Sequence, residues 1–357
     1  MVDPGAKPRR PRRGLVAAVF AFGVCLLALP AMLSDREELV RTLQSTDPRM
    51  LLLPLLLTVA SYAAMSRSYQ GIADIAGCRL SFRRWLQITY VSNAVNFVVP
   101  SAGLSGFAVR MYLLSHQGVA RGQAVLISLV QTLLTNFTLL FFILGGFVSL
   151  VVHERLETPA LITATVAVAA FAGILTLGGV LIFHRRWRRQ VLLRVANLAH
   201  RGLHRFAPRR APRRVKLWRF QHNLNEGLDF VLARKNRMIG PAAWIMLDWV
   251  LTIGILWAAF RAVRNPLPPG IVAVGFAVGV FLSLVSFVPG GLGVMDLSMT
   301  AVFASLGVPL EPAVLAVYIF RVAYYFLPLL TSVVLFWSAL RQAAHDVATA
   351  SETDAAI

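Results

Sequence analysis

The sequence contains few charged residues. Asp, Glu, Lys and Arg make up 14% of the 357 residues, and only 16 residues are acidic, whereas soluble domains usually contain about 25% charged residues. Hydrophobic residues make up 57%. Several stretches continue for about 18 residues or more with almost no charge, the length that an α-helix needs to cross a bilayer. The composition excludes a soluble globular protein and predicts an all-α, polytopic membrane protein.

Cysteine and recognisable catalytic motifs are also scarce. The two cysteines are Cys25, in the first apolar stretch, and Cys78, in a basic loop, so we expect neither a disulfide between them nor a metal site built on them. The sequence has no HExxH, no GxSxG, no P-loop and no paired-carboxylate motif for a metal. We therefore expect no cofactor and no bound metal, and catalysis is the less favoured interpretation.

The net charge of +19 comes from two segments. Residues 1–13 contain five basic residues and one acidic residue, and residues 184–237 contain 16 basic and two acidic residues. These segments contribute +4 and +14, and the remainder of the chain is nearly neutral. Basic segments of this kind are typical of the cytoplasmic loops of membrane proteins, and no aromatic platform for base stacking accompanies them. We therefore expect no nucleic-acid partner.

Apolar stretches define two membrane halves between polar segments. We predict a basic cytoplasmic tail at 1–13, a first membrane half at 14–183, a basic cytoplasmic loop at 184–240, a second half at 241–340 and a short cytoplasmic tail at 341–357. About six full spans are expected: 14–33, 50–66, 123–152, 159–183, 241–262 and 311–338. The first span resembles a signal peptide with a poor cleavage site, so we expect it to be retained.

Two further apolar regions, 85–116 and 270–306, are interrupted by proline and glycine. Each half of either region is short for a full crossing. The two regions superimpose without a gap when Pro100 is placed on Pro289, and Gly118 then falls on Gly307. This match predicts an internal repeat, with simple helix–turn–helix punctuation as the alternative. The turn residues are Pro100, Gly103, Pro289, Gly290, Gly291 and Gly293.

The distribution of Lys and Arg predicts a protein of the cell membrane with both termini in the cytoplasm. In that orientation the region 85–116 enters as a re-entrant hairpin from the cytoplasm, and the region 270–306 enters from outside. The two repeats would then be inverted. Inverted repeats with broken helices are typical of transporters, and the amino termini of half-helices suit an anionic group. The alternative topology makes both regions full helical hairpins.

Four charged residues lie within apolar segments, where each costs about 2.5 to 3.5 kcal/mol on insertion scales. They are Arg110, Asp248, Asp296 and Arg321. We predict that Arg110 and Arg321 hold a lipid phosphate, because a guanidinium matches phosphate oxygens and stays charged when desolvated. Asp248 or Asp296 would balance their charge. The alternative is a structural role, as two ion pairs or as an Arg that extends to the surface.

Neighbouring polar residues could complete this site. Tyr318, Arg321 and Tyr325 follow at i, i+3 and i+7 and so share one helix face, although packing is the commoner role of such aromatic residues. Asn93 and Asn96 precede Pro100 and could contact a headgroup or hydrogen-bond between helices. The basic loop 184–240 could bind the anionic inner leaflet or serve only to set the topology.

Two motifs resemble the flippase-like membrane domain of the lysylphosphatidylglycerol synthase family. The first is SNAVNFVVPSAGLSGFAVRMYLL with GVARGQAV, and the second is SFVPGGLGVMDLSM with LGVPLEPAVLAVYIFRVAYY. The family often has an acidic residue near the first turn, where this chain has Phe107 and Val109, and Glu where this chain has Asp296. The resemblance covers most of the chain. It implies movement of an aminoacyl phospholipid or a polyprenyl-phosphate-linked sugar between leaflets, and we expect the translocating part without the soluble synthase domain.

We therefore predict a lipid flippase whose direct partners are membrane lipids. Two alternatives stay open: a non-catalytic scaffold that docks a glycosyltransferase or lipid-modifying enzyme through the basic loop, and a membrane-embedded transferase. A polar cavity shared by Arg110 and Arg321 would favour transport, whereas structural pairing of separate arginines would favour the scaffold. The sequence makes no prediction of the oligomeric state.

Overall fold

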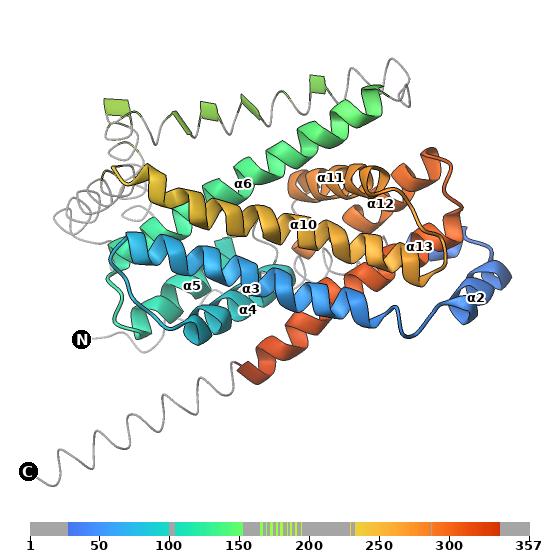
Figure 1. The fold of residues 1–357 in the computed structure, drawn as a ribbon, viewed down its shortest axis with the longest axis horizontal. Coiled ribbons are helices and arrows are strands. Elements are labelled where there is room, and N and C mark those ends of the chain that lie inside the picture. Colours follow the sequence, from blue (N-terminus) through green and yellow to red (C-terminus); the bar gives the residue numbers. More distant parts are fainter. Residues whose placement is uncertain are drawn as a thin grey trace, which may run out of the picture.

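The computed structural model describes residues 28–99, 104–152, 233–286 and 288–335, together with single positions between 165 and 229. These residues form helices and contain no strand, which confirms the predicted all-α class (Figure 1). The predictions for residues 1–13, Pro100, Gly103 and 341–357, and for most of 14–33, 159–183 and 184–240, lie outside the described residues. The α-helices that lie whole within the four described ranges are α2 Arg36–Ser45, α3 Leu52–Ile75, α4 Phe82–Val98, α5 Leu104–His116, α6 Arg121–Val152, α10 Ile239–Ala262, α11 Pro269–Ser286, α12 Val294–Ser305 and α13 Leu310–Arg321.

Three described helices are long and apolar enough to cross a membrane. They cover Arg121–Gly146, Asn236–Ala262 and Leu310–Leu335, and shorter apolar helices cover Pro269–Ser283 and Val294–Ser305. The third long helix is α13 continued through a π-helical segment, Val322–Phe326. These helices agree with the predicted spans 123–152, 241–262 and 311–338. The predicted span 50–66 corresponds to α3, which is longer because its second half buries Ser66 and Ser68 against protein instead of ending in solvent.

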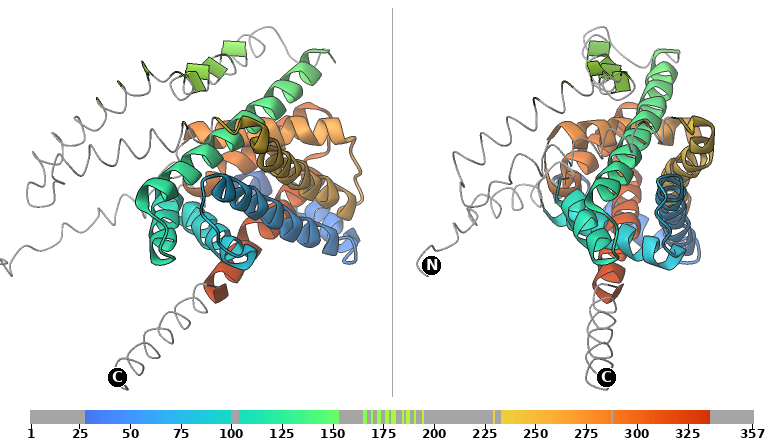
Figure 2. Two further views of the ribbon diagram at one scale, coloured as in Figure 1. Left: turned by 60° about the vertical axis from the view of Figure 1, so that its left-hand side comes forward. Right: turned by 90° about the vertical axis from the view of Figure 1, so that its left-hand side faces the viewer.

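The helices α3 and α10 run antiparallel and pack along their lengths, as two further directions of view also show (Figure 2). At one end the amide of Asp47 donates to the carbonyl of Ala262 at 2.9 Å. At the other end Ser68 Oγ donates to the carbonyl of Pro241 at 2.9 Å. A Cβ at Gly71 would lie 2.9 Å from Pro241 Cγ, so only glycine allows the helices to approach this closely there.

Each interrupted apolar region forms a hairpin of two short helices. The helices α4, α5, α11 and α12 contain 17, 13, 18 and 12 residues. At 1.5 Å per residue they are about 18 to 27 Å long, which is less than the hydrocarbon thickness of about 30 Å. The hairpin of α4 and α5 lies in the left half of Figure 1, and that of α11 and α12 lies in the right half. This arrangement favours re-entrant hairpins over full crossings.

The tips of the two hairpins meet inside the protein. A Cβ built at Gly290, in the turn between α11 and α12, would lie 3.1 Å from the carbonyl oxygen of Phe97, near the end of α4. The backbone at Gly290 has φ 54°, a conformation that favours glycine. The ring of Phe97 also packs on that of Tyr325, with centroids 4.4 Å apart. The non-helical backbone of the second hairpin is thus covered by the first, as irregular backbone within a membrane requires.

The internal repeat is visible in backbone geometry. Gly118 and Gly307, which the sequence match superimposes, follow α5 and α12 with φ angles of 75° and 83°. In both cases the amide after the glycine bonds to the carbonyl five residues before it, at 3.1 and 3.0 Å. The next helices, α6 and α13, begin at Arg121 and Leu310, which the same register also superimposes. The gapless match in sequence therefore corresponds to equivalent structure.

A second pair of equivalent turns shows that the repeats are inverted. Gly77 after α3 and Arg264 after α10 have φ angles of 78° and 58°, and Arg264 is the only non-glycine residue with positive φ among those described. The amides that follow them bond five residues back at 2.8 and 3.0 Å. These turns make α3 and α10 equivalent. Because these two helices are equivalent yet antiparallel, a pseudo-twofold axis passes between them, perpendicular to the helix axes.

The contact between the hairpin tips predicts a disulfide. In a protein with Cys25→Ala and Cys78→Ala, we expect Phe97→Cys and Gly290→Cys to cross-link, because the Cβ atoms would lie 3.5 Å apart, within the disulfide range. Cross-linking is measured by mass spectrometry after mild oxidation. Phe97→Cys with Gly307→Cys is the control, because nothing lies within 4 Å of a Cβ at Gly307. Equal yields in both pairs would contradict the contact between the tips.

Candidate functional site

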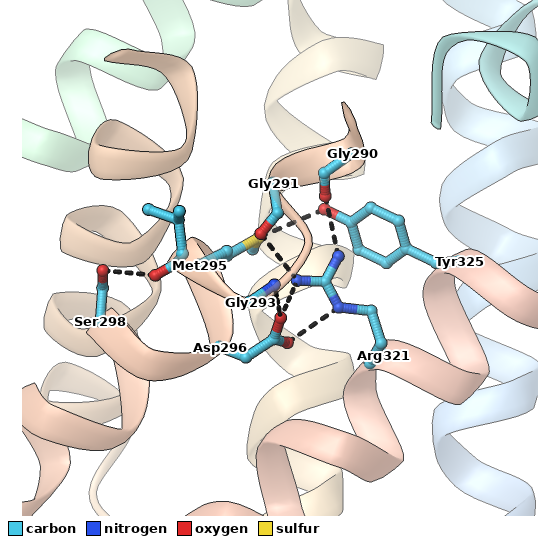
Figure 3. A network of polar contacts seen from close by, with 9 residues as sticks. Gly290, Gly291, Gly293, Met295, Asp296, Ser298, Arg321 and Tyr325 are labelled. Carbon is cyan, nitrogen blue, oxygen red and sulfur yellow. Dashed lines mark hydrogen bonds and ion pairs between the residues drawn. The ribbon is translucent and has the colours of Figure 1, made fainter. Parts of the chain in front are cut away.

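The guanidinium of Arg321 fastens the tip of the second hairpin to α13 (Figure 3). Its Nε donates to Asp296 Oδ1 at 2.8 Å and its Nη2 to Asp296 Oδ2 at 2.5 Å. Its Nη1 and Nη2 also donate to the carbonyls of Gly290 and Gly291, at 2.8 and 3.4 Å. Arg321 is 2% exposed and Asp296 1% exposed. Four of the five guanidinium N–H groups are therefore already engaged within the protein.

Asp296 has a second function in the same cluster, because it caps the start of α12. Its Oδ2 accepts a hydrogen bond from the amide of Gly293 at 2.9 Å, and an acidic side chain in a first helical turn is also favoured by the helix dipole. The carboxylate thus fixes the second half of the hairpin while Arg321 fixes the turn before it. We call Arg321, Asp296 and the turn Gly290–Gly293 the clamp.

The predicted aromatic stripe divides between two environments. The centroid of the Tyr325 ring lies 4.2 Å from Arg321 Cζ, and the Tyr325 hydroxyl donates to Met295 Sδ at 3.3 Å, so Tyr325 packs against the clamp. Tyr318 lines a cavity of about 480 Å³ beside Arg321. The cavity is largely apolar, and the exposed Arg36 at the start of α2 lies on its wall. Its lining residues are Ala28, Ala31, Met32, Arg36, Tyr318, Arg321, Val322 and Phe326.

Arg110, at the middle of α5, is buried without a carboxylate partner among the described residues. It is 7% exposed. One Nη donates a long hydrogen bond of 3.4 Å to Ser92 Oγ, and the guanidinium carbon lies 4.4 Å from the centroid of the Tyr69 ring. Its Nε has no hydrogen-bond partner in the described part of the chain. A buried charge that is compensated this weakly is unusual and points to function.

Asn93 and Asn96 make contacts within the membrane half that contains Arg110. Asn93 Nδ2 lies 3.1 Å from Met65 Sδ, and Asn96 Oδ1 accepts from Ser105 Oγ at 3.4 Å. A Cβ at Gly106 would lie 3.0 Å from Asn96 Cβ, so α4 and α5 approach closely here. Both amides take part in contacts between helices, and their predicted contact with a headgroup stays a prediction.

Asp248 lies at the centre of the interface between α3 and α10. It is 5% exposed, and its Oδ1 accepts a hydrogen bond from Ser61 Oγ at 2.5 Å. Ser61 Oγ is also 3.2 Å from Thr252 Oγ1. In the register that places Gly77 on Arg264, Ser61 falls on Asp248, so their contact lies on the pseudo-twofold axis. Sequence reasoning identified Asp248 but not Ser61 or Thr252.

The structure pairs only some of the four predicted charges. Arg321 and Asp296 form an ion pair, whereas Arg110 and Asp248 form none among the described residues. No described contact joins Arg110 to Arg321, so the sequence-based interpretation of one site with both guanidiniums receives no support from geometry. Tyr69, Ser92 and Arg36 were not identified from the sequence; the repeat register gave no signal for them, because their importance comes from neighbours on other helices.

The described residues contain no group of three His, Cys, Asp or Glu side chains able to hold a metal ion. Burial and the nearby Asp74 carboxylate raise the pKa of the Cys78 thiol, which lies in the turn after α3. The thiol therefore has little thiolate character near neutral pH. Neither observation provides a catalytic group next to Arg110 or the clamp.

Comparison with known proteins identifies a match over most of the chain. The family model described as "Lysylphosphatidylglycerol synthase TM region" matches residues 15–332. A phosphatidylglycerol lysyltransferase of Staphylococcus haemolyticus is 32% identical over 104 residues, 29% of this chain and 12% of that protein. A phosphatidylglycerol lysyltransferase of Staphylococcus aureus is 42% identical over 60 residues, 17% of this chain and 7% of that protein. The matched segments thus cover a small part of these relatives.

Proposed function

The chain belongs to the lysylphosphatidylglycerol synthase transmembrane family, and from this membership we propose that it moves a phosphate-bearing lipid between the leaflets of the membrane. Membership of this family and the apolar helices give the chain a membrane, lipid-related role. The finer proposal is a flippase. Its substrate is an aminoacyl phospholipid or a polyprenyl-phosphate-linked sugar, and these share a phosphate ester on an apolar chain. We assign no catalytic step to the membrane part.

The buried guanidinium of Arg110, which has no carboxylate partner among the described residues, is the observation that supports this proposal most strongly. Burying a cation without an anion is costly, and the cost falls when a phosphate supplies two oxygens to the guanidinium fork. The guanidinium of Arg321 already forms an ion pair with the carboxylate of Asp296. We therefore assign the phosphate-binding role to Arg110, with Tyr69 and Ser92 beside it, and a positioning role to Arg321 and Asp296.

The architecture provides a physical basis for movement between leaflets. The two hairpins enter from opposite ends of the bundle and meet at Phe97 and Gly290, so a thin barrier separates the two sides at this point. Re-entrant hairpins around such a barrier are a known basis of alternating access. The apolar cavity between Arg36 and Tyr318 has a lining suited to an acyl or prenyl chain at the end of the bundle where α2 lies.

Lipid movement in proteoliposomes tests the proposal. Fluorescent analogues of lysylphosphatidylglycerol and of a polyprenyl-phosphate sugar are incorporated, and dithionite reports how fast the inner pool reaches the outer leaflet. We expect the wild type to accelerate one analogue over protein-free vesicles, and Arg110→Gln to slow it at least about tenfold, because charged hydrogen bonds contribute about 1.5 to 3 kcal/mol. The matched control is Arg121→Gln, which replaces an exposed arginine at the start of α6.

Each outcome of this experiment is informative. Movement that is equal in Arg110→Gln and wild type would contradict the phosphate-binding role while leaving a flippase. Absence of movement for both analogues in folded wild-type protein would contradict the flippase. The favoured alternative would then be a scaffold that docks a glycosyltransferase or lipid-modifying enzyme. The basic loop 184–240 would be the segment with which to test for binding of such an enzyme.

A further inference from the structure

The carboxyl of Asp248 is buried, and the described part of the chain supplies it with no compensating cation. No Lys, Arg or His nitrogen lies within 4 Å of it among the residues described, and its one side-chain hydrogen bond comes from Ser61. Asp296 provides the internal comparison: this aspartate of the same protein, equally buried, has Arg321 and the amide of Gly293 on its oxygens. An isolated carboxylate in a low-dielectric interior is much less stable than the neutral acid. The described surroundings of Asp248 thus lack the partners that hold the Asp296 carboxyl, and they suit a carboxyl with a bound proton.

The ionisable groups around Asp248 are mostly tyrosines. Tyr62 and Tyr69 of α3 and Tyr324 of the π-helical segment are the tyrosines nearby, and a neutral phenol supplies no positive charge to the carboxyl. The only acidic or basic residue described on α6 is Arg121, which is exposed at its start, and α11 has none. On α12 and α13, Asp296 and Arg321 pair with each other. No described cation is therefore placed to hold Asp248 in its charged form.

Tyr69 connects this carboxyl to the proposed phosphate site. The centroid of its ring lies 4.4 Å from the guanidinium carbon of Arg110. Tyr69 belongs to the same helix, α3, as Ser61, which donates to the Asp248 carboxyl. A shift of α3 that opens the contact between Ser61 and Asp248 would therefore also move the ring on which Arg110 packs.

The position of Asp248 also connects it to the relative movement of the two repeats. Its bond to Ser61 lies on the pseudo-twofold axis, where the first repeat touches the second. The ring of Tyr62 also lies beside that of Tyr324, in the π-helical segment that follows Arg321, with ring centroids 5.8 Å apart. π-Helical segments within α-helices are frequent at functional sites. A charged Asp248 needs water or a cation and favours a hydrated, opened interface, whereas the neutral acid favours a dry, closed one.

We propose that Asp248 binds and releases the proton that couples lipid movement to the proton gradient. The carboxylate takes up one proton from the side to which it is open and releases it on the other side after the repeats change position. No covalent bond is made or broken apart from this O–H bond. The coupling role rests on the proposed flippase function, but the proton site itself does not and can be measured without any lipid substrate.

Infrared difference spectroscopy of the full chain in liposomes tests the proton site. We expect wild type at neutral pH to show the C=O stretch of a protonated carboxyl, which is lost in Asp248→Asn and shifted in Ser61→Ala, where the hydrogen bond is removed. Asp74→Asn, which changes an exposed aspartate at the end of α3, should leave the band unchanged. A wild type without this band at neutral pH, or with the band retained in folded Asp248→Asn, would overturn the proposal.

A pH gradient across proteoliposomes tests the coupling. For one proton per lipid, we expect wild type to accumulate the moved analogue up to about tenfold per pH unit, because a tenfold ratio corresponds to about 1.4 kcal/mol. Asp248→Asn should equilibrate the lipid without accumulation. If no analogue moves in wild type, the flippase proposal fails and the infrared result still decides the proton site. Movement that ignores the pH gradient, or follows a sodium gradient instead, would overturn proton coupling alone.

Discussion

Asp296→Asn is expected to destabilise the folded protein by about 3 to 5 kcal/mol, because it leaves the buried guanidinium of Arg321 without its counter-ion. Asparagine keeps a side-chain oxygen for the amide of Gly293, so this substitution isolates the charge of the clamp from its capping function. Asp296→Ala removes both and should cost about a further 1 kcal/mol. The melting temperature of purified protein in a mild detergent, with circular dichroism at 222 nm to report helix content, measures the effect.

A double substitution separates the ion pair from the remaining contacts of the clamp. Arg321→Met together with Asp296→Asn removes both charges, and we expect it to be more stable than Asp296→Asn alone, because the clamp then contains no charge that lacks a partner. Destabilisation that is simply the sum of the two single substitutions would show that Arg321 and Asp296 act independently. The close contact between the two side chains would then contribute no interaction energy of its own.

Arg110→Met is expected to have the opposite effect on stability. Methionine keeps much of the apolar length of the side chain and removes a buried cation for which the described residues offer only Ser92 and the ring of Tyr69 as compensation. Replacing buried ionic groups by apolar ones of similar size is often neutral or stabilises by about 1 to 4 kcal/mol. We therefore expect an unchanged or raised melting temperature together with loss of lipid movement. This is the trade-off expected of a functional site.

The same substitution at the other guanidinium is the matched control. Arg321→Met should lower the melting temperature, because it leaves the buried carboxyl of Asp296 without its counter-ion, whereas Arg110→Met should not. Opposite signs for one chemical change at two buried arginines would distinguish the binding residue from the positioning residue without any transport assay. A large loss of stability in Arg110→Met would instead assign Arg110 a structural role and remove the main support for the phosphate site.

The clamp makes the two repeats chemically unequal. In the register that places Pro100 on Pro289, Asp296 and Arg321 correspond to Phe107 and Thr132, so the first hairpin has no ion pair in the equivalent place. Its buried charge is Arg110, which corresponds to Met299. The second hairpin is therefore fixed to α13 by an ionic contact, while the described part of the first hairpin is held mainly by close packing, as at Gly106 and Ser92. This difference favours the first hairpin as the half that responds to a bound phosphate.

The sequence by itself determined the membrane class, the helical content and the repeat. The low charge content and the long apolar stretches indicate segments that lie in lipid. Such segments form helices, because each backbone polar group must then hydrogen-bond within its own segment. The register between Pro100 and Pro289 fixed the repeat, because it depends only on residue spacing. The family resemblance rested on the same two motifs and is confirmed over residues 15–332. The orientation of the termini and the roles of the site residues stay predictions.

Only the tertiary structure decided which charges have partners. Arg321 lies far along the chain from Asp296, and Ser61 farther still from Asp248. Neither contact follows from hydropathy, which places residues within a helix but not helices against each other. The offset along the chain that relates α3 to α10 also differs from the offset that relates the segments after the two hairpins. A gapless sequence match uses a single offset, so it cannot reveal both correspondences. The four charged residues that lie within apolar segments look alike in the sequence. The packing of the helices brings Arg321 and Asp296 together as an ion pair. Among the described residues, it places only neutral side chains against Arg110 and Asp248.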